Sequence, residues 1–117
     1  MSSDQERRHL RVSVRLRVRI RSEEGEELLF FTRNVSLGGL FLLIQPPLQT
    51  ESQLRMELLT GREAIAVKGR VVRSEEYGCA FEFQDVDSET TERLRSLIAT
   101  LLDRSASAVQ SIAHSRV

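Results

Sequence analysis

Apolar and polar residues alternate without a break over residues 12–21. Val12, Val14, Leu16, Val18 and Ile20 fall on one side of an extended chain, and the other side carries a serine and four arginines. A period of two held over this length predicts a half-buried β-strand.

Five further apolar segments are short enough to be strands, and turn residues separate them. They cover residues 28–32, 40–44, 54–59, 64–73 and 77–83. The segment from Asn34 to Gly39 is expected to be a turn, because Asn and Ser bond nearby backbone and two glycines allow positive φ. Six short strands with regular turn signals predict a mainly β fold, a closed or nearly closed six-stranded antiparallel barrel.

The hydrophobic period changes near residue 87, where a helix is predicted. Asp87 or Ser88 can cap its N-terminus. Five apolar residues then follow at helical spacing, which predicts a C-terminal helix with one face packed on the barrel: Leu94, Leu97, Ile98, Leu101 and Leu102. The expected organisation is an arginine-rich N-terminal arm over 1–11, a barrel plus helix over 12–103, and a tail or short helix over 104–117.

Charge is balanced overall but unevenly distributed. The chain has 117 residues and a formal net charge of zero, which suits one domain with no global field toward nucleic acid or anionic lipid. Residues 7–21 nevertheless hold seven arginines and no acid. Arginine presents a planar fork that can grip a phosphate or a guanine edge with two hydrogen bonds.

The sequence gives no positive sign of catalysis. Cys79 is the only cysteine and is expected to be a small buried hydrophobe, and His9 and His114 lie near opposite ends of the chain. No His, Cys, Asp and Glu set has metal-ligand spacing. We therefore expect no catalytic residues, no metal and no cofactor. With no apolar signal segment or membrane span in the sequence, a cytoplasmic protein is the default expectation.

Two short motifs carry the candidate chemistry: Arg7-Arg8-His9-Leu10-Arg11 and Asn34-Val35-Ser36-Leu37-Gly38-Gly39. An Arg-x-x-x-Arg match is weak here, because the chain contains four. The second motif is rarer, although a plain hairpin turn also favours Asn, Ser and Gly. The order of parts adds weight: an arginine arm, an alternating strand, a hairpin, the Asn/Ser turn and an apolar strand.

That order resembles the PilZ family, bacterial receptors for cyclic di-GMP. The two motifs match its RxxxR and D/N-x-S-x-x-G signatures, and the resemblance extends over roughly residues 6–102. One departure is Leu10, where many relatives have proline. The resemblance implies a split barrel and the ligand-binding set Arg7, Arg8, Arg11, Asn34, Ser36 and Gly39.

By family analogy, each residue of this set has an expected role. Arg7, Arg8 and Arg11 would bind guanine edges, stack on a base and neutralise phosphate, and Asn34 would bind the other guanine edge. Ser36 would bond a base or phosphate, and Gly39 would allow close approach of the backbone. Arg8→Ala or Ser36→Ala is expected to abolish binding and leave the fold intact.

The implied function is that of a single-domain receptor. Binding of cyclic di-GMP would order the arm and alter the interaction with a downstream effector protein that the sequence does not identify. We expect no DNA or RNA binding and no membrane insertion, and a monomer or weak homodimer.

Two alternatives remain open. One is a PilZ-like protein-interaction adapter with weak or no nucleotide binding. The other is a small nucleic-acid-binding barrel that uses the strip Arg15–Arg21. The second is disfavoured because base stacking needs exposed aromatics, and the six aromatic residues fall almost wholly within core-like strand runs.

Overall fold

The computed structural model describes residues 10–115, with side chains as far as residue 104. Seven strands precede one helix in this part of the chain. The elements are β1 (Val12–Ser13), β2 (Arg17–Arg21), β3 (Glu27–Val35), β4 (Gly39–Leu43), β5 (Gln53–Leu59), β6 (Ala64–Glu75), β7 (Gly78–Gln84) and α2 (Ser88–Ser115).

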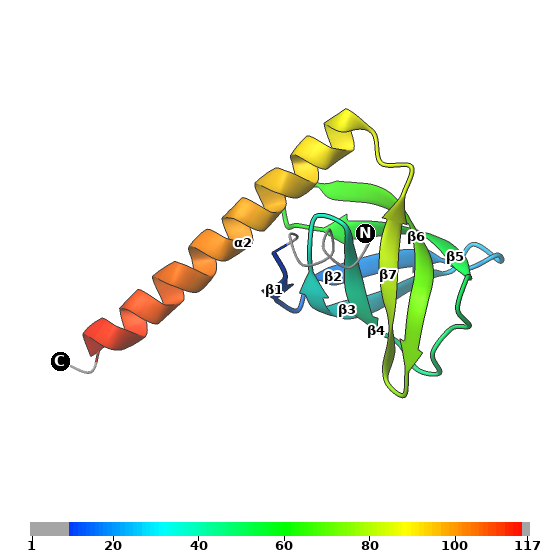
Figure 1. The fold of residues 1–117 in the computed structure, drawn as a ribbon, viewed down its shortest axis with the longest axis horizontal. Coiled ribbons are helices and arrows are strands. Elements are labelled where there is room, and N and C mark those ends of the chain that lie inside the picture. Colours follow the sequence, from blue (N-terminus) through cyan, green and yellow to red (C-terminus); the bar gives the residue numbers. More distant parts are fainter. Residues whose placement is uncertain (1–9, 116–117) are drawn as a thin grey trace, which may run out of the picture.

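The sheet closes on itself. Its hydrogen-bonded order runs β3, β2, β5, β6, β7, β4, and a further antiparallel pairing of β4 with β3 completes the ring. β1 is an additional strand, paired with the end of β3. Figure 1 shows the barrel with α2 crossing one side of it. The predicted six-stranded antiparallel barrel is therefore confirmed, and closure leaves few free strand edges.

The segment predicted as one strand over residues 12–21 is divided into β1 and β2. Between them, the Thr32 hydroxyl donates to the Val14 carbonyl oxygen (2.6 Å) and accepts from the Leu16 N–H (3.0 Å). The register changes across this point, from Ser13 opposite Asn34 to Arg17 opposite Phe31. A buried side chain thus replaces part of the backbone ladder, which the apolar alternation could not reveal.

The barrel core is built from the inward face of each strand and one face of the helix. Val12, Leu16, Val18 and Ile20 are buried, as their alternation predicted. Cys79 is completely buried, as expected, and its Sγ accepts a hydrogen bond from the Leu48 N–H. These residues belong to one continuous hydrophobic cluster.

β3 departs from prediction in two ways. Phe31 points outward and is 44% exposed, although the aromatic residues were expected almost wholly within core-like strand runs, and Leu29 on the same face is 56% exposed. Asn34 was expected in a turn, but it lies within β3 and pairs with Ser13 on one side and Phe41 on the other. The turn itself is confined to residues 36–38.

Asp87, of the two predicted capping residues, caps α2. Its carboxylate accepts a hydrogen bond from the Thr90 N–H at 2.7 Å. Leu94, Leu97, Ile98 and Leu101 join the barrel core, whereas Leu102 is 39% exposed.

The helix does not end near residue 103. It continues as one element to Ser115 and extends beyond the barrel (Figure 1), so the segment 104–115 is part of α2 and not a separate tail or second helix. Within the described residues, no helix is long and apolar enough to cross a membrane.

Candidate functional site

The two sequence motifs meet on the outer surface of the barrel where β1 pairs with β3. Arg11 Nη1 lies 3.4 Å from Asn34 Oδ1, across 23 residues of sequence. The side chain of Arg11 is exposed and that of Asn34 is half-buried, so both are open to a ligand. Arg7 and Arg8 lie outside the described residues. The structure therefore brings together one arginine of the first motif and the amide of the second.

A β-bulge turns Asn34 toward this surface. The register of β3 against β4 shifts between Thr32 and Asn34. Thr32 and Val35 are both buried, so the two residues between them, Arg33 and Asn34, face outward together. Bulges commonly change the direction of side chains beside functional sites, and here the bulge places two polar side chains, Arg33 and Asn34, on the outward face of β3.

Ser36 holds the turn that follows. Its hydroxyl donates to the Gly39 carbonyl oxygen (3.2 Å) and accepts from the Gly38 N–H (3.3 Å). The residue is 5% exposed. In this arrangement the hydroxyl is engaged inside the hairpin, and Ser36 shapes the backbone beside Asn34.

Gly39 is required by close packing. A Cβ at this position would overlap the carbonyl oxygen of Phe81 on β7. Positive φ was also expected in this turn, but among glycines of the described residues it occurs only at Gly25 and Gly61. Gly39 therefore permits β4 to approach β7 closely, which positions the whole turn.

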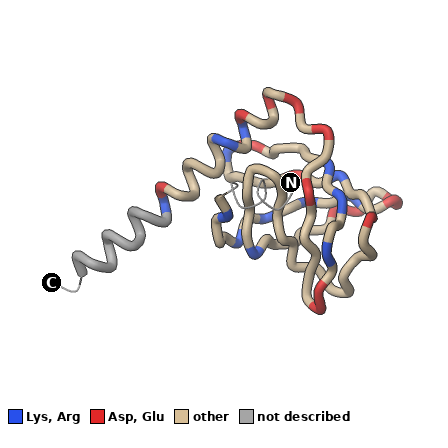
Figure 2. Tube along the Cα trace, viewed as in Figure 1, with Lys and Arg blue, Asp and Glu red and all other residues tan. Residues whose placement is uncertain are grey.

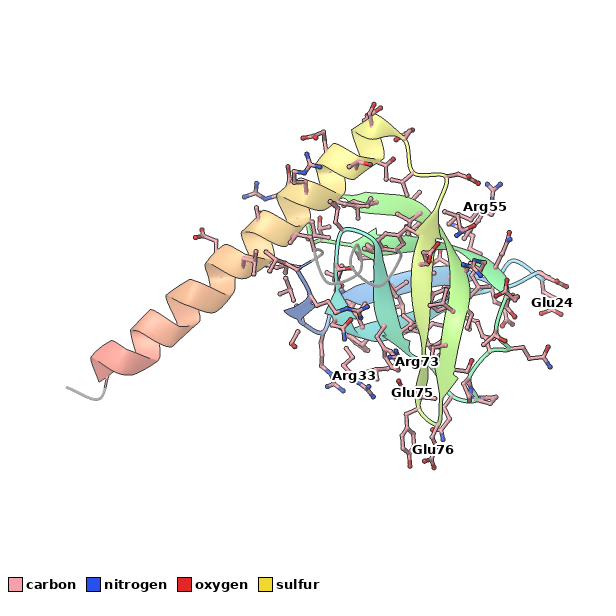
Figure 3. The ribbon with its side chains drawn as sticks, viewed as in Figure 1. Glu24, Arg33, Arg55, Arg73, Glu75 and Glu76 are labelled. Carbon is pink, nitrogen blue, oxygen red and sulfur yellow. The ribbon has the colours of Figure 1, made fainter. Side chains whose placement is uncertain are left out.

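A group of side chains beside Asn34 was not predicted from the sequence. We call it the Phe41 cluster: Phe41, Arg33, Arg73 and Glu75. Phe41 is 1% exposed, yet it lies outside the barrel core, directly opposite Asn34 in the β3–β4 ladder. The Arg33 guanidinium carbon stands 4.2 Å from the centre of its ring, within cation–π range. Figure 3 shows Arg33, Arg73 and Glu75 gathered at one side of the barrel.

The arginine strip of β2 is partly neutralised by neighbouring acids. Arg19 pairs with Glu57 at 3.0 Å, and Arg21 pairs with Glu27 at 3.1 Å. The hydrogen bond from Arg19 lowers the pKa of the Glu57 carboxyl. Figure 2 shows charges of both signs distributed over the barrel. Two of the four arginines in the strip Arg15–Arg21 are therefore paired with acids of neighbouring strands.

The expectation for aromatic residues needs correction. Phe81 and Phe83 are in the core, but Phe31 and Tyr77 are 44% and 56% exposed. The centre of the Phe31 ring also lies 5.9 Å from the Arg15 guanidinium carbon. A lack of exposed aromatics is therefore no argument against nucleic-acid binding.

A groove of about 850 Å³ lies elsewhere, between β5, β6 and the segment before α2. Its lining carries four basic and four acidic side chains, so the formal charges cancel: Arg19, Arg21, Arg55 and Lys68 against Glu23, Glu57, Asp85 and Asp87. None of the described predicted site residues lines it. Within the described residues, no cluster of His, Cys, Asp and Glu could hold a metal ion.

Solved structures with the same fold come from bacterial proteins. The PilZ domain of YcgR from Escherichia coli with c-di-GMP aligns with a TM-score of 0.76 at 17% identity, covering 91% of this chain and 98% of that one. The longer YcgR chain in complex with c-di-GMP gives 0.74 at 18% identity, covering 90% of this chain and 50% of that one. The K. pneumonia MrkH–c-di-GMP complex gives 0.71 at 22% identity, covering 86% and 54%. The chain thus spans about half the length of the longer YcgR chain and of MrkH.

A search of curated proteins gives no match. The family model described as PilZ domain matches residues 5–100, which is most of the chain. This match includes both motifs, the strand that carries Asn34 and most of the apolar face of α2. Together with the closed barrel and its extra strand, it shows that the chain belongs to the PilZ domain family.

Proposed function

We propose that this chain is a receptor for cyclic di-GMP that binds its ligand without transforming it. The observation that carries the proposal is the contact of Arg11 with Asn34, because it joins the two motif halves on one open surface. YcgR and MrkH have been solved in complex with c-di-GMP, which supports the same ligand class here.

The chemistry of the surface suits a guanine-bearing diester. Arginine can hold the O6 and N7 acceptors of guanine with two parallel hydrogen bonds. An amide such as that of Asn34 offers both donors and an acceptor to a base edge. The ligand's phosphates would offset the positive charge of Arg11 and of the preceding arginines, Arg7 and Arg8, whose roles and ordering on binding stay predictions.

Calorimetric titration with cyclic di-GMP tests the proposal. Arg11→Ala and Asn34→Ala should each weaken binding about tenfold or more, because each removes a hydrogen bond to a charged or polar group of the ligand. Arg17→Ala is the matched control, because Arg17 is an exposed arginine on β2 away from Asn34. This variant should bind cyclic di-GMP like the unaltered protein. Absence of heat with the unaltered protein would contradict the proposal.

A second candidate, a protein-interaction adapter, has one observation in its favour. Leu29 and Phe31 share the outward face of β3 and are 56% and 44% exposed, and neighbouring exposed apolar groups favour a docking surface. The two functions are compatible, because the contact of Arg11 with Asn34 and the exposed apolar side chains of β3 involve different residues. If the titration shows no binding, the adapter becomes the leading proposal.

A further inference from the structure

The Phe41 cluster is built around an aromatic ring that is buried on the outside of the barrel. Phe41 faces away from the core between Asn34 on β3 and Ala80 on β7. Gly78 makes room for the ring, because a Cβ at residue 78 would collide with it. Two guanidinium groups cover the ring, with the carbons of Arg33 and Arg73 at 4.2 and 6.0 Å from its centre.

Two β-bulges direct the side chains of these arginines toward the Phe41 ring. The first lies in β3 between Thr32 and Asn34, and the second lies in β6 between Val71 and Arg73. After the second bulge, Arg73 stands opposite Ala80, which in turn stands opposite Phe41. Bulges interrupt a ladder locally, so two of them around one aromatic residue indicate a surface shaped for contact.

Glu75 supplies the negative charge between the two arginines. Its Oε2 lies 2.9 Å from Arg73 Nε, and its Oε1 lies 3.7 Å from Arg33 Nη1 (Figure 3). The side chains of Arg33, Arg73 and Glu75 are 50%, 59% and 41% exposed. The carboxylate can therefore move away without uncovering a buried charge. A phosphate group offers the same kind of acceptor to paired arginines.

We propose that Glu75 is an internal competitor for the ligand. In the free protein it holds Arg33 and Arg73 over Phe41, and an anionic group of the bound nucleotide displaces it and takes over both arginines. The inference rests on the proposed function, since Asn34 is the direct cross-strand neighbour of Phe41 and a nucleotide held at Asn34 reaches the cluster. Glu75 then lowers the affinity of the free receptor, and Arg33 and Arg73 join the ligand-binding set.

A purely structural role for Glu75 and the competitor role differ in the ligand affinity that they predict for a variant without the carboxylate. Exposed ion pairs contribute little to folding, so loss of Glu75 should hardly change the melting temperature under either reading. Only the competitor role raises affinity when the carboxylate is removed. The readout is therefore ligand affinity, measured alongside an unchanged melting temperature.

The test is calorimetric titration of Glu75→Gln and Glu76→Gln with cyclic di-GMP at fixed salt. Glu76 is the next residue, is exposed and carries the same charge, so it controls for the general effect of removing a negative charge near the site. Glu75→Gln should bind about fivefold tighter, corresponding to release of two weak ion pairs, and Glu76→Gln should bind like the unaltered protein.

Coupling to the arginines completes the test. In an Arg33→Ala/Arg73→Ala background, the gain from Glu75→Gln should vanish, as expected for groups that act as one unit. Unchanged or weaker binding by Glu75→Gln, with normal binding by the unaltered protein, would overturn this inference and leave the proposed function standing. No binding by the unaltered protein would overturn both.

Discussion

At the scale of single residues, the turn after β3 separates groups that shape the site from groups that can contact a ligand. Ser36 is 5% exposed and uses its hydroxyl within the turn, and Gly39 is fitted against the backbone of β7. Arg11 and Asn34 have side chains that a ligand can reach. The sequence predicts that Ser36→Ala abolishes binding and leaves the fold intact. Because the hydroxyl is used within the turn, a loss of binding in this variant would also include a change in the turn.

Gly39→Ala provides the test at this scale. The added methyl group would meet the Phe81 carbonyl oxygen, which is backbone and cannot move alone. We expect a loss of about 2 kcal/mol in the free energy of unfolding, measured by urea denaturation. A variant as stable as the unaltered protein would show that β4 and β7 can separate without cost.

At the scale of elements, the break between β1 and β2 depends on one buried hydroxyl. Thr32→Val keeps the shape of the side chain but removes the donor to Val14 and the acceptor for Leu16. Unsatisfied buried backbone groups should lower the free energy of unfolding by about 1–3 kcal/mol in urea denaturation. Thr32→Ser keeps the hydroxyl and should be affected less. Equal losses in the two variants would exclude the hydroxyl as the cause.

The cap of α2 makes stability depend on pH. The hydrogen bond from the Thr90 N–H, followed by one from its side chain, lowers the pKa of Asp87 in the folded protein. A lowered pKa gives stabilisation that is present above the unfolded-state value of about 3.9 and is lost as the pH falls through the folded-state value.

Thermal unfolding across that pH range measures the effect of the cap. The melting temperature of Asp87→Ala should lie below that of the unaltered protein at neutral pH, and the difference should shrink in acid. Asp87→Asn keeps a capping side chain without the charge, so its melting temperature should show less of this pH dependence. A difference between Asp87→Ala and the unaltered protein that stays constant with pH would contradict the assignment.

At the scale of the whole molecule, sequence periodicity was sufficient to predict the barrel and the helix face. Alternation identifies inward residues such as Val18, and helical spacing identifies Leu94 and its neighbours. It could not locate the bulges, because Thr32 and Val71 look like ordinary strand residues.

The candidate site was predictable only in part for the same reason. Motif matching selected Arg11 and Asn34, which do meet. Arg33, Arg73 and Phe41 come together only through pairings between distant strands, so no local pattern marks them. Helix α2 also runs further than the loss of strong apolar periodicity suggested, and the alanines over 106–113 are good helix formers.

Amide chemical-shift mapping during a titration would show whether cyclic di-GMP binds where Arg11 meets Asn34. We expect the largest shift changes at residues 11–13 and 33–41, with little change at Arg55 and Lys68 in the groove beside α2. No shift changes, or changes confined to that groove, would contradict this expectation.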